Sequence, residues 1–279
     1  MNISFNNNIN FGSGLTKQIL EAEQKTKPYM IKRYFQQSSY KDWADFYNID
    51  FKNNKACALA SRMCAEIFKG FRKKHDYRNS YSMQELVFPH DLCVFNVNEL
   101  SKELKNNPYL DFFCTLDGSV FINNKYNNLE EINAFADTNK AIGYHSSGHF
   151  LSWFIHEWLH AIQNKLIYNF TSHRGYGNFE QTRIRFFQER KLDKKENEIV
   201  KDILGEYATI HDSNTAQYSE VFAEAWTKFI CDSLDKDCLH FRKDPVEEMK
   251  RTPKEFQKIL EKVSKVEFFD IWGNPKKNY

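Results

Sequence analysis

Apolar residues recur at intervals of three and four positions in three stretches of the chain, residues 56–71, 146–168 and 218–233. This spacing places the apolar side chains on one face of an α-helix, so each stretch is predicted to be a helix with one buried side. Pro253 suits the first turn of a fourth helix, whose apolar positions follow it. The charged segment 180–191 is predicted to be a helix with a solvated surface.

In the segment before the helix predicted at 146–168, short apolar runs and alternating apolar and polar residues replace the helical spacing. Strands are predicted at 91–97, 110–114 and 119–123, the last two joined by an Asp-Gly turn. A further short strand at 140–144 is expected to lead the chain into the central helix. Shorter helices are predicted at the remaining patterned segments, 98–105, 129–136 and 196–207. The predicted fold class is α+β, with a small mixed sheet and a mostly helical C-terminal lobe.

Composition divides the chain into three regions. Residues 1–14 are rich in asparagine and are expected to be disordered. Residues 15–90 are predicted to form a helical N-terminal region. Residues 91–279 are long enough to bury a core, and we expect one domain there with a sheet lobe at 91–145 and a helical lobe at 146–279.

Charge and hydropathy exclude several classes of protein. Lys and Arg number 39 against 37 Asp and Glu, and this net charge of +2 does not favour nucleic acid as a partner. No apolar run reaches the length of a membrane span, and the N-terminus lacks the pattern of a Sec signal peptide. We therefore expect a cytoplasmic protein or one exported by a non-Sec route. The six cysteines form no C-x-x-C pair, so they are predicted to be reduced thiols and not zinc ligands.

The central helix carries an H-E-x-x-H motif, in which His156, Glu157 and His160 are the chemically active positions. Residues four apart lie one turn apart on nearly the same helix face, so both imidazoles can bind one metal ion. Glu157 stands beside the first histidine, where a carboxylate can act as a general base toward water. The motif also arises by chance, and two incidental histidines in a core helix are the alternative. The strongly apolar helix around it favours the metal site.

A catalytic zinc ion takes three protein ligands, so a third ligand is expected outside this helix. Glu220 is favoured, because it opens the apolar-striped helix at 218–233 and Glu224 follows one turn later on the same face. A buried carboxylate needs a partner: zinc would serve Glu220, and Glu224 could orient a histidine ligand through its second ring nitrogen. The other candidates by residue type are Glu180, His173 and His211.

H-E-x-x-H followed by E-x-F-A-E resembles the catalytic domain of anthrax lethal factor and the related zincins among bacterial toxins, effectors and phage-associated proteins. The resemblance covers about residues 110–265 and extends to Gly-Tyr-His at 143–145 and Pro-Lys-Glu-Phe at 253–256. It implies a zincin-like metalloprotease fold with the H-E-x-x-H helix in the active site. The zinc ligands that it implies are His156, His160 and Glu220.

The resemblance is incomplete at one catalytic position. The family places a catalytic tyrosine seven residues before the glutamate ligand, where this chain has Ser213. The nearest match is Tyr207, which the resemblance implies as the hydrogen-bond donor to the developing oxyanion. The alternative donors are Tyr218, His211 and His173.

The resemblance implies a zinc-dependent endopeptidase of the gluzincin type that hydrolyses a protein or peptide substrate, with Glu157 as general base. The strand at 119–123 could be the sheet edge that pairs with an extended peptide, as in zincins generally, or an internal strand. One alternative function is a non-catalytic zincin-fold binding module of a toxin or phage system. Another is hydrolysis of a non-peptide bond at the same metal site.

Overall fold

The computed structural model describes residues 60, 63–64, 67–68, 92–95, 111–114, 120–123, 125–126, 128–172, 187, 190–209, 217–234 and 241–263. The strands are β1 (Leu92–Phe95), β2 (Phe112–Cys114) and β3 (Val120–Asn123). The helices are α6 (Leu129–Ala141), α7 (Ser152–Ser172), α9 (Lys194–Leu204), the 3-10 helix η6 (Tyr207–Thr209), α10 (Gln217–Ser233), α11 (Pro245–Lys250) and α12 (Lys254–Val263). The fold class is therefore α+β, as predicted. Within this described part of the chain, no helix has the length and hydropathy that a membrane span requires.

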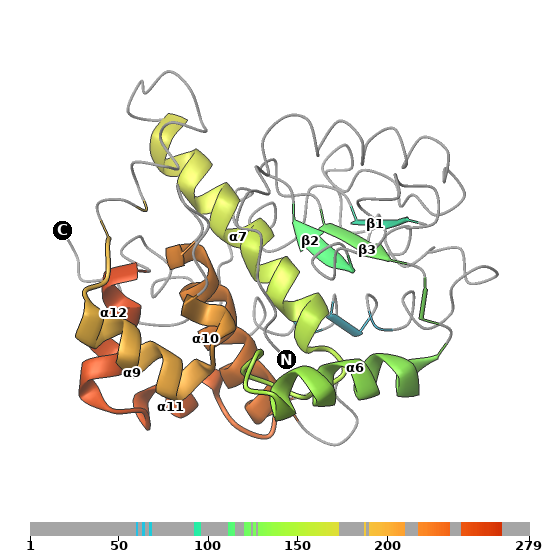
Figure 1. Ribbon diagram of the computed structural model, residues 1–279. Helices are drawn as coiled ribbons and strands as arrows, with labels where there is room; N and C mark the ends of the chain where they lie inside the picture. Colours follow the sequence, from blue (N-terminus) through green and yellow to red (C-terminus); the bar gives the residue numbers. More distant parts are fainter. Residues whose placement is uncertain are drawn as a thin grey trace.

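Helix α7 lies between the sheet on one side and the group α9 to α12 on the other (Figure 1). Trp158 of α7 is 1% exposed, and its ring stacks on that of Phe68 with ring centroids 5.4 Å apart. Phe68 is helical and buried, as are Ala60 and Cys64, which agrees with the helix predicted at 56–71. The predicted apolar stripe of α7 is buried at Leu151, Phe154, Ile155, Trp158, Leu159 and Ile162. The central helix is thus held in the core from both sides.

The strands form a small mixed sheet in the order β1-β3-β2. β3 pairs in parallel with β1 and antiparallel with β2. Phe112 of β2 packs edge-on against Phe154 of α7, with ring centroids 5.0 Å apart, which fixes the sheet against the central helix. Because β3 lies between the other two strands, the interpretation of 119–123 as an internal strand is correct, and the edge interpretation is wrong.

The short strand predicted at 140–144 is wrong. Helix α6 continues to Ala141 and is closed by Gly143, which has φ +71° and donates from its N–H to the carbonyl of Lys140 at 2.9 Å. The next residue, Tyr144, donates back to the carbonyl of Asn139 at 2.9 Å. The apolar run that resembled a strand is therefore the end of one helix and a tight turn.

Helix α7 begins at Ser152, later than predicted, so Ser146 and Ser147 lie too far ahead of it to cap its first turn. The backbone N–H of Ser152 donates to the carbonyl of His149 at 2.8 Å, and that of Leu151 donates to His149 Nδ1 at 3.2 Å. Burial lowers the pKa of His149 to about 4, so its neutral ring keeps a lone pair for this N–H. An imidazole caps the central helix in place of a hydroxyl.

The C-terminal helices follow the predicted pattern closely. α10 buries its whole stripe, Phe222, Ala225, Trp226, Phe229 and Ile230. α9 starts at a capping box between Asp193 and Glu196 and ends at Gly205, so the helix predicted at 196–207 is shorter and is followed by η6. α12 begins directly after Pro253, as expected. The predictions for 1–14, 98–105 and most of 15–90 and 180–191 lie outside the described residues.

Candidate metal centre

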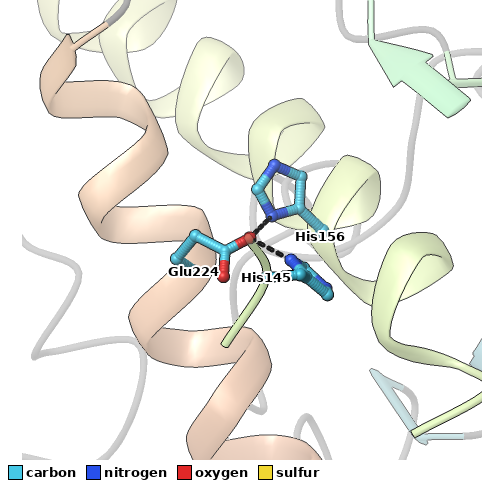
Figure 2. Close-up of side chains that lie close together, drawn as sticks. All are labelled: His145, His156 and Glu224. Carbon is cyan, nitrogen blue, oxygen red and sulfur yellow. Dashed lines mark ion pairs between the residues drawn. The ribbon is translucent and has the colours of Figure 1, made fainter. Parts of the chain in front are cut away.

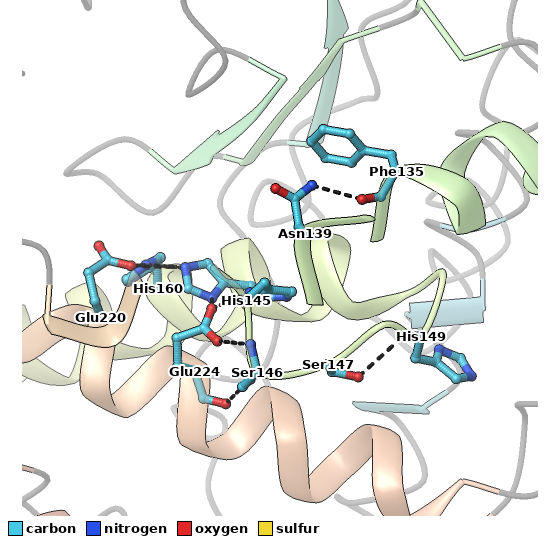
Figure 3. Close-up of polar contacts among 10 residues, drawn as sticks. Phe135, Asn139, His145, Ser146, Ser147, His149, His160, Glu220 and Glu224 are labelled. Atoms are coloured by element: carbon cyan, nitrogen blue, oxygen red, sulfur yellow. Dashed lines mark hydrogen bonds and ion pairs between the residues drawn. The ribbon is translucent and has the colours of Figure 1, made fainter. Parts of the chain in front are cut away.

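Three candidate ligand atoms converge between α7 and α10 (Figure 3). His156 Nε2 lies 2.9 Å from His160 Nε2 and 3.1 Å from Glu220 Oε2. His160 Nε2 lies 3.2 Å from the same oxygen of Glu220. Metal–ligand bonds of about 2.0–2.1 Å in tetrahedral geometry separate neighbouring ligand atoms by about 3.3 Å. The triangle therefore has the size that one zinc-like ion requires.

Glu224 lies one turn further along α10 and contacts the other nitrogen of His156 (Figure 2). Its Oε1 atom is 2.9 Å from His156 Nδ1. An ionised carboxylate only accepts hydrogen bonds, so Nδ1 carries a hydrogen and Nε2 is the nitrogen left for a metal ion. Nε2 faces His160 and Glu220, which is the orientation that a metal ligand needs. This contact agrees with the orienting role expected for Glu224.

The charges around the site suit a cation. Burial alone would raise the pKa of Glu220, but His160 and His156 together hold it well below its ordinary value, so the carboxylate stays ionised. Burial would lower the pKa of His156, yet Glu220 and Glu224 raise it well above its ordinary value. The half-buried carboxylate of Glu220 and the buried one of Glu224 thus favour positive charge on the His156 ring, and a metal ion at Nε2 would supply that charge in place of a proton.

Glu157 follows His156 on α7 and is 4% exposed. Burial raises the pKa of its carboxyl group, although the neighbouring His156 and His160 lower it. A carboxylate with a raised pKa is a stronger base than one in water. Glu157 is therefore suited to accept a proton, as the sequence motif predicts.

The ring of Tyr207, in η6, lies close to the site. Its ring centroid lies 5.5 Å from that of His156 and 5.9 Å from that of Trp153. Burial raises the pKa of Tyr207 well above its ordinary value, and Glu220 and Glu157 add to this effect. The phenol therefore keeps its proton and can donate it in a hydrogen bond. Of the four predicted donors, Tyr207 is the one whose side chain the described residues bring to the site.

The position of Tyr207 depends on a backbone contact with the turn that precedes α7. Glu206 donates from its N–H to the carbonyl of Gly143 at 2.8 Å, and Tyr207 donates to that of Tyr144 at 3.0 Å. Gly205 makes this approach feasible: its φ of +95° with ψ of −178° is a conformation that glycine alone adopts readily. A Cβ atom built there would lie 2.8 Å from the carbonyl oxygen of Gly143.

We predict that Gly205→Ala lowers the free energy of unfolding by about 1–3 kcal/mol, because alanine is strained at this backbone conformation and its methyl group meets a carbonyl oxygen. Denaturant unfolding measures the loss. The control is Gly143→Ala, where φ is +71° but no atom lies within 4 Å of the added Cβ, so the loss should be smaller. A Gly205→Ala variant as stable as the wild type would contradict this view of the turn.

A second group, His145, His156 and Glu224, also lies close enough to hold an ion. Both imidazoles present Nδ1 to the same oxygen, Oε1 of Glu224, and His145 contacts it directly. Charge attraction between the two imidazoles and one ionised carboxylate oxygen accounts for this arrangement without an ion. We therefore interpret His145 and Glu224 as residues that orient His156 and not as ligands of a second ion.

Most predicted site residues come together in the structure, while some lie beyond the described residues. The ligand atoms of His156, His160 and Glu220 converge, the ring of Tyr207 lies beside that of His156, and Glu157 is near enough to interact electrostatically with both histidines. Glu180, His173 and His211 lie outside the described residues, as does the side chain of Tyr218. His145 and Ser146 were missed as site residues, because a loop has no periodicity that marks which side chains turn inward. The Gly-Tyr-His similarity at 143–145 was the signal that could have drawn attention to them.

Comparisons with protein-family models, curated proteins and solved structures gave no match for this chain. Its function is therefore inferred from the residues and geometry of the site.

Proposed function

We propose that this protein is a zinc-dependent endopeptidase of the gluzincin type with a zincin-like fold. The observation that carries the proposal is the convergence of His156 Nε2, His160 Nε2 and Glu220 Oε2 within 3.2 Å of one another. Glu157, the residue after His156, has a buried carboxylate whose pKa is raised, and it interacts electrostatically with both histidines. Two imidazoles and a glutamate are the ligand set of several zinc peptidases.

The chemistry of the donor atoms favours zinc over other common cations. Calcium and magnesium prefer shells made of oxygen, whereas two of the three atoms here are imidazole nitrogens. None of the cysteines in the described residues belongs to the group, which argues against a closed structural zinc site of the cysteine type. Three protein ligands leave a position for water or substrate, as catalysis requires.

Peptide hydrolysis follows from the roles that the side chains can play. A zinc ion held by His156, His160 and Glu220 supplies Lewis acidity toward the scissile carbonyl and lowers the pKa of water. Glu157 accepts a proton from the attacking water and returns it to the leaving amine. Tyr207, still protonated because of its raised pKa, donates a hydrogen bond to the carbonyl oxygen as negative charge develops.

The architecture supports the zincin-like part of the proposal. A central helix carries both histidines, a small mixed sheet covers one side of it, and the third ligand comes from a later helix. The same elements carry the resemblance to the lethal factor family, so a toxin- or effector-like peptidase is the favoured class. The non-catalytic alternative predicts the same fold but needs neither the buried base at Glu157 nor a protonated phenol nearby.

The identity of the third ligand can be tested with three glutamine variants of matched shape. We expect Glu220→Gln to weaken zinc binding severely, because a neutral amide is a poor donor to zinc. Glu224→Gln should weaken it about 10–100-fold, because Glu224 acts only through His156. Glu180→Gln should change it little. Competition with a chromophoric chelator gives the three zinc affinities.

A large loss of zinc affinity at Glu180 with little at Glu220 would contradict the proposal. The third ligand would then lie about twenty residues after His160, the spacing of thermolysin-like enzymes, and the role proposed for Tyr207 would be lost with it.

A further inference from the structure

The side chain of His145 is fully buried in the turn between α6 and α7, although no step of the proposed chemistry uses it. Its Nδ1 atom contacts Oε1 of Glu224, the oxygen that also faces His156 (Figure 2). Its ring stacks on Trp153, with centroids 4.3 Å apart and planes 15° apart. These two contacts fix both the position and the rotation of the imidazole.

We propose that His145 is a positioning residue of the metal centre, which holds the Glu224 carboxylate in the orientation that directs His156 Nε2 toward the ion. This inference rests on the proposed zinc site. The line of contacts runs from His145 Nδ1 through Glu224 Oε1 to His156 Nδ1.

Glu224 needs such support because its side chain is fully buried and its last torsion is soft. The torsion that turns a glutamate carboxylate has broad preferences, so packing alone does not select one orientation. Here Oε2 accepts the backbone N–H of Ser146 at 2.8 Å, while Oε1 faces the two imidazoles. Rotating the carboxylate would break the buried hydrogen bond from Ser146 and move Oε1 away from the two imidazoles.

The turn that carries His145 joins all three elements of the site. The hydroxyl of Ser146 donates to the backbone carbonyl of Glu224 at 3.0 Å, which ties the turn to α10 (Figure 3). The carbonyl of Tyr144 receives the N–H of Tyr207, which ties it to η6. The same turn then continues into α7, which carries the histidine ligands. His145 is therefore placed to set the distance between ligands that come from different helices.

Burial distinguishes a positioning role from a catalytic one. The side chain of His145 is 0% exposed, so a peptide substrate cannot touch it, whereas those of His160 and Glu220 are 12% and 15% exposed. His145 does not contact the three converging ligand atoms. It contacts Glu224 Oε1, which in turn contacts Nδ1 of His156, the ring nitrogen that faces away from the proposed ion. Its effect should therefore appear in metal affinity before any substrate is added.

The test measures zinc affinity of the full chain by chelator competition, with zinc alone as the ligand. His145→Phe keeps an aromatic ring against Trp153 but removes the N–H, and we expect it to bind zinc about 10–100-fold more weakly. His145→Asn and His145→Gln are both amides, but only asparagine carries its N–H near the place of Nδ1. Asparagine should therefore restore most of the affinity and glutamine should not.

A double variant tests whether the effect passes through Glu224. If it does, His145→Phe combined with Glu224→Gln should bind zinc no more weakly than Glu224→Gln alone, because the two changes break one connection. Additive losses would mean that His145 acts by another route and would overturn the inference.

The outcomes separate this inference from the proposed function. A wild-type chain that binds no zinc would overturn the proposed function and this inference together. Wild-type zinc binding with equal affinity in His145→Phe would overturn the positioning role and leave the proposed function intact. Should the phenylalanine variant fail to fold, the two amide variants decide, and equal zinc affinity in them would overturn the role.

Discussion

The double variant His156→Ala/His160→Ala is expected to bind no zinc, and each single variant is expected to lose stoichiometric binding. Each alanine removes one of three donor atoms that lie within 3.2 Å of one another. A tight structural site gains roughly 10–16 kcal/mol from about four ligands, so one ligand is worth about 2.5–4 kcal/mol, roughly a hundredfold to a thousandfold in affinity. Metal analysis after dialysis against metal-free buffer gives the stoichiometry.

The matched control removes an imidazole from the start of the same helix. His149→Asn loses the ring that caps α7, but asparagine is itself a good cap, so the helix and its zinc should be retained. A double variant of the motif histidines that still carries one zinc per chain would contradict the assignment of these ligands.

Glu157→Gln is expected to keep the fold and the zinc while lowering the rate of peptide hydrolysis by about 10²–10⁴-fold. General base catalysis contributes a factor of this size, and the amide cannot accept the proton of the attacking water. The volume is almost unchanged, so the packing around this buried residue should persist. Turnover of a peptide library by the zinc-loaded protein measures the loss of rate. Melting curves and metal content test whether the fold and the zinc are retained.

The control is the same substitution at an exposed position of α9, Glu198→Gln, which should leave turnover unchanged. Wild-type turnover in Glu157→Gln would show that the hydrolytic activity lies elsewhere in the chain. A wild-type chain that binds zinc but cleaves no peptide would instead favour a binding module or a hydrolase of another bond.

The sequence predicted the parts of the site that depend on local periodicity. The side chains of His156 and His160 meet because four residues make about one helical turn, and the apolar stripe around them made the helix evident. Glu220 and Glu224 were placed on one face of a second helix for the same reason. That the two helices bring these residues together follows from the burial of both stripes, at Trp158 and at Trp226 for example.

The turn between α6 and α7 could not be predicted in the same way. Its sequence, KAIGY, has an apolar character that suits a strand as well as the end of a helix, and Gly143 decides the outcome through its positive φ. The contacts of His145 and Ser146 with Glu224 join residues far apart in the chain. A single sequence carries no signal for such contacts, because they depend on how the complete helices pack against one another.

Tyr207 could be proposed from the family resemblance but not from the local sequence pattern. Nothing in the local sequence distinguishes it from Tyr144, whose ring centroid lies 4.9 Å away. Only the similarity of its surroundings to a family motif suggested it, and the expected spacing to the glutamate ligand did not hold. Its place beside His156 depends on Gly205, whose backbone conformation allows the segment to approach the turn at Gly143.

The central claim is that one zinc ion is held by two imidazoles and one carboxylate, and the X-ray absorption spectrum of the protein loaded with one equivalent of zinc tests it most directly. The spectrum should show four or five nitrogen and oxygen neighbours at about 2.0–2.2 Å, with the multiple scattering of two imidazoles. A sulfur neighbour at about 2.3 Å would place the zinc on cysteines, and a shell of oxygen without imidazole would mean adventitious binding. Either result would contradict a centre built from His156, His160 and Glu220.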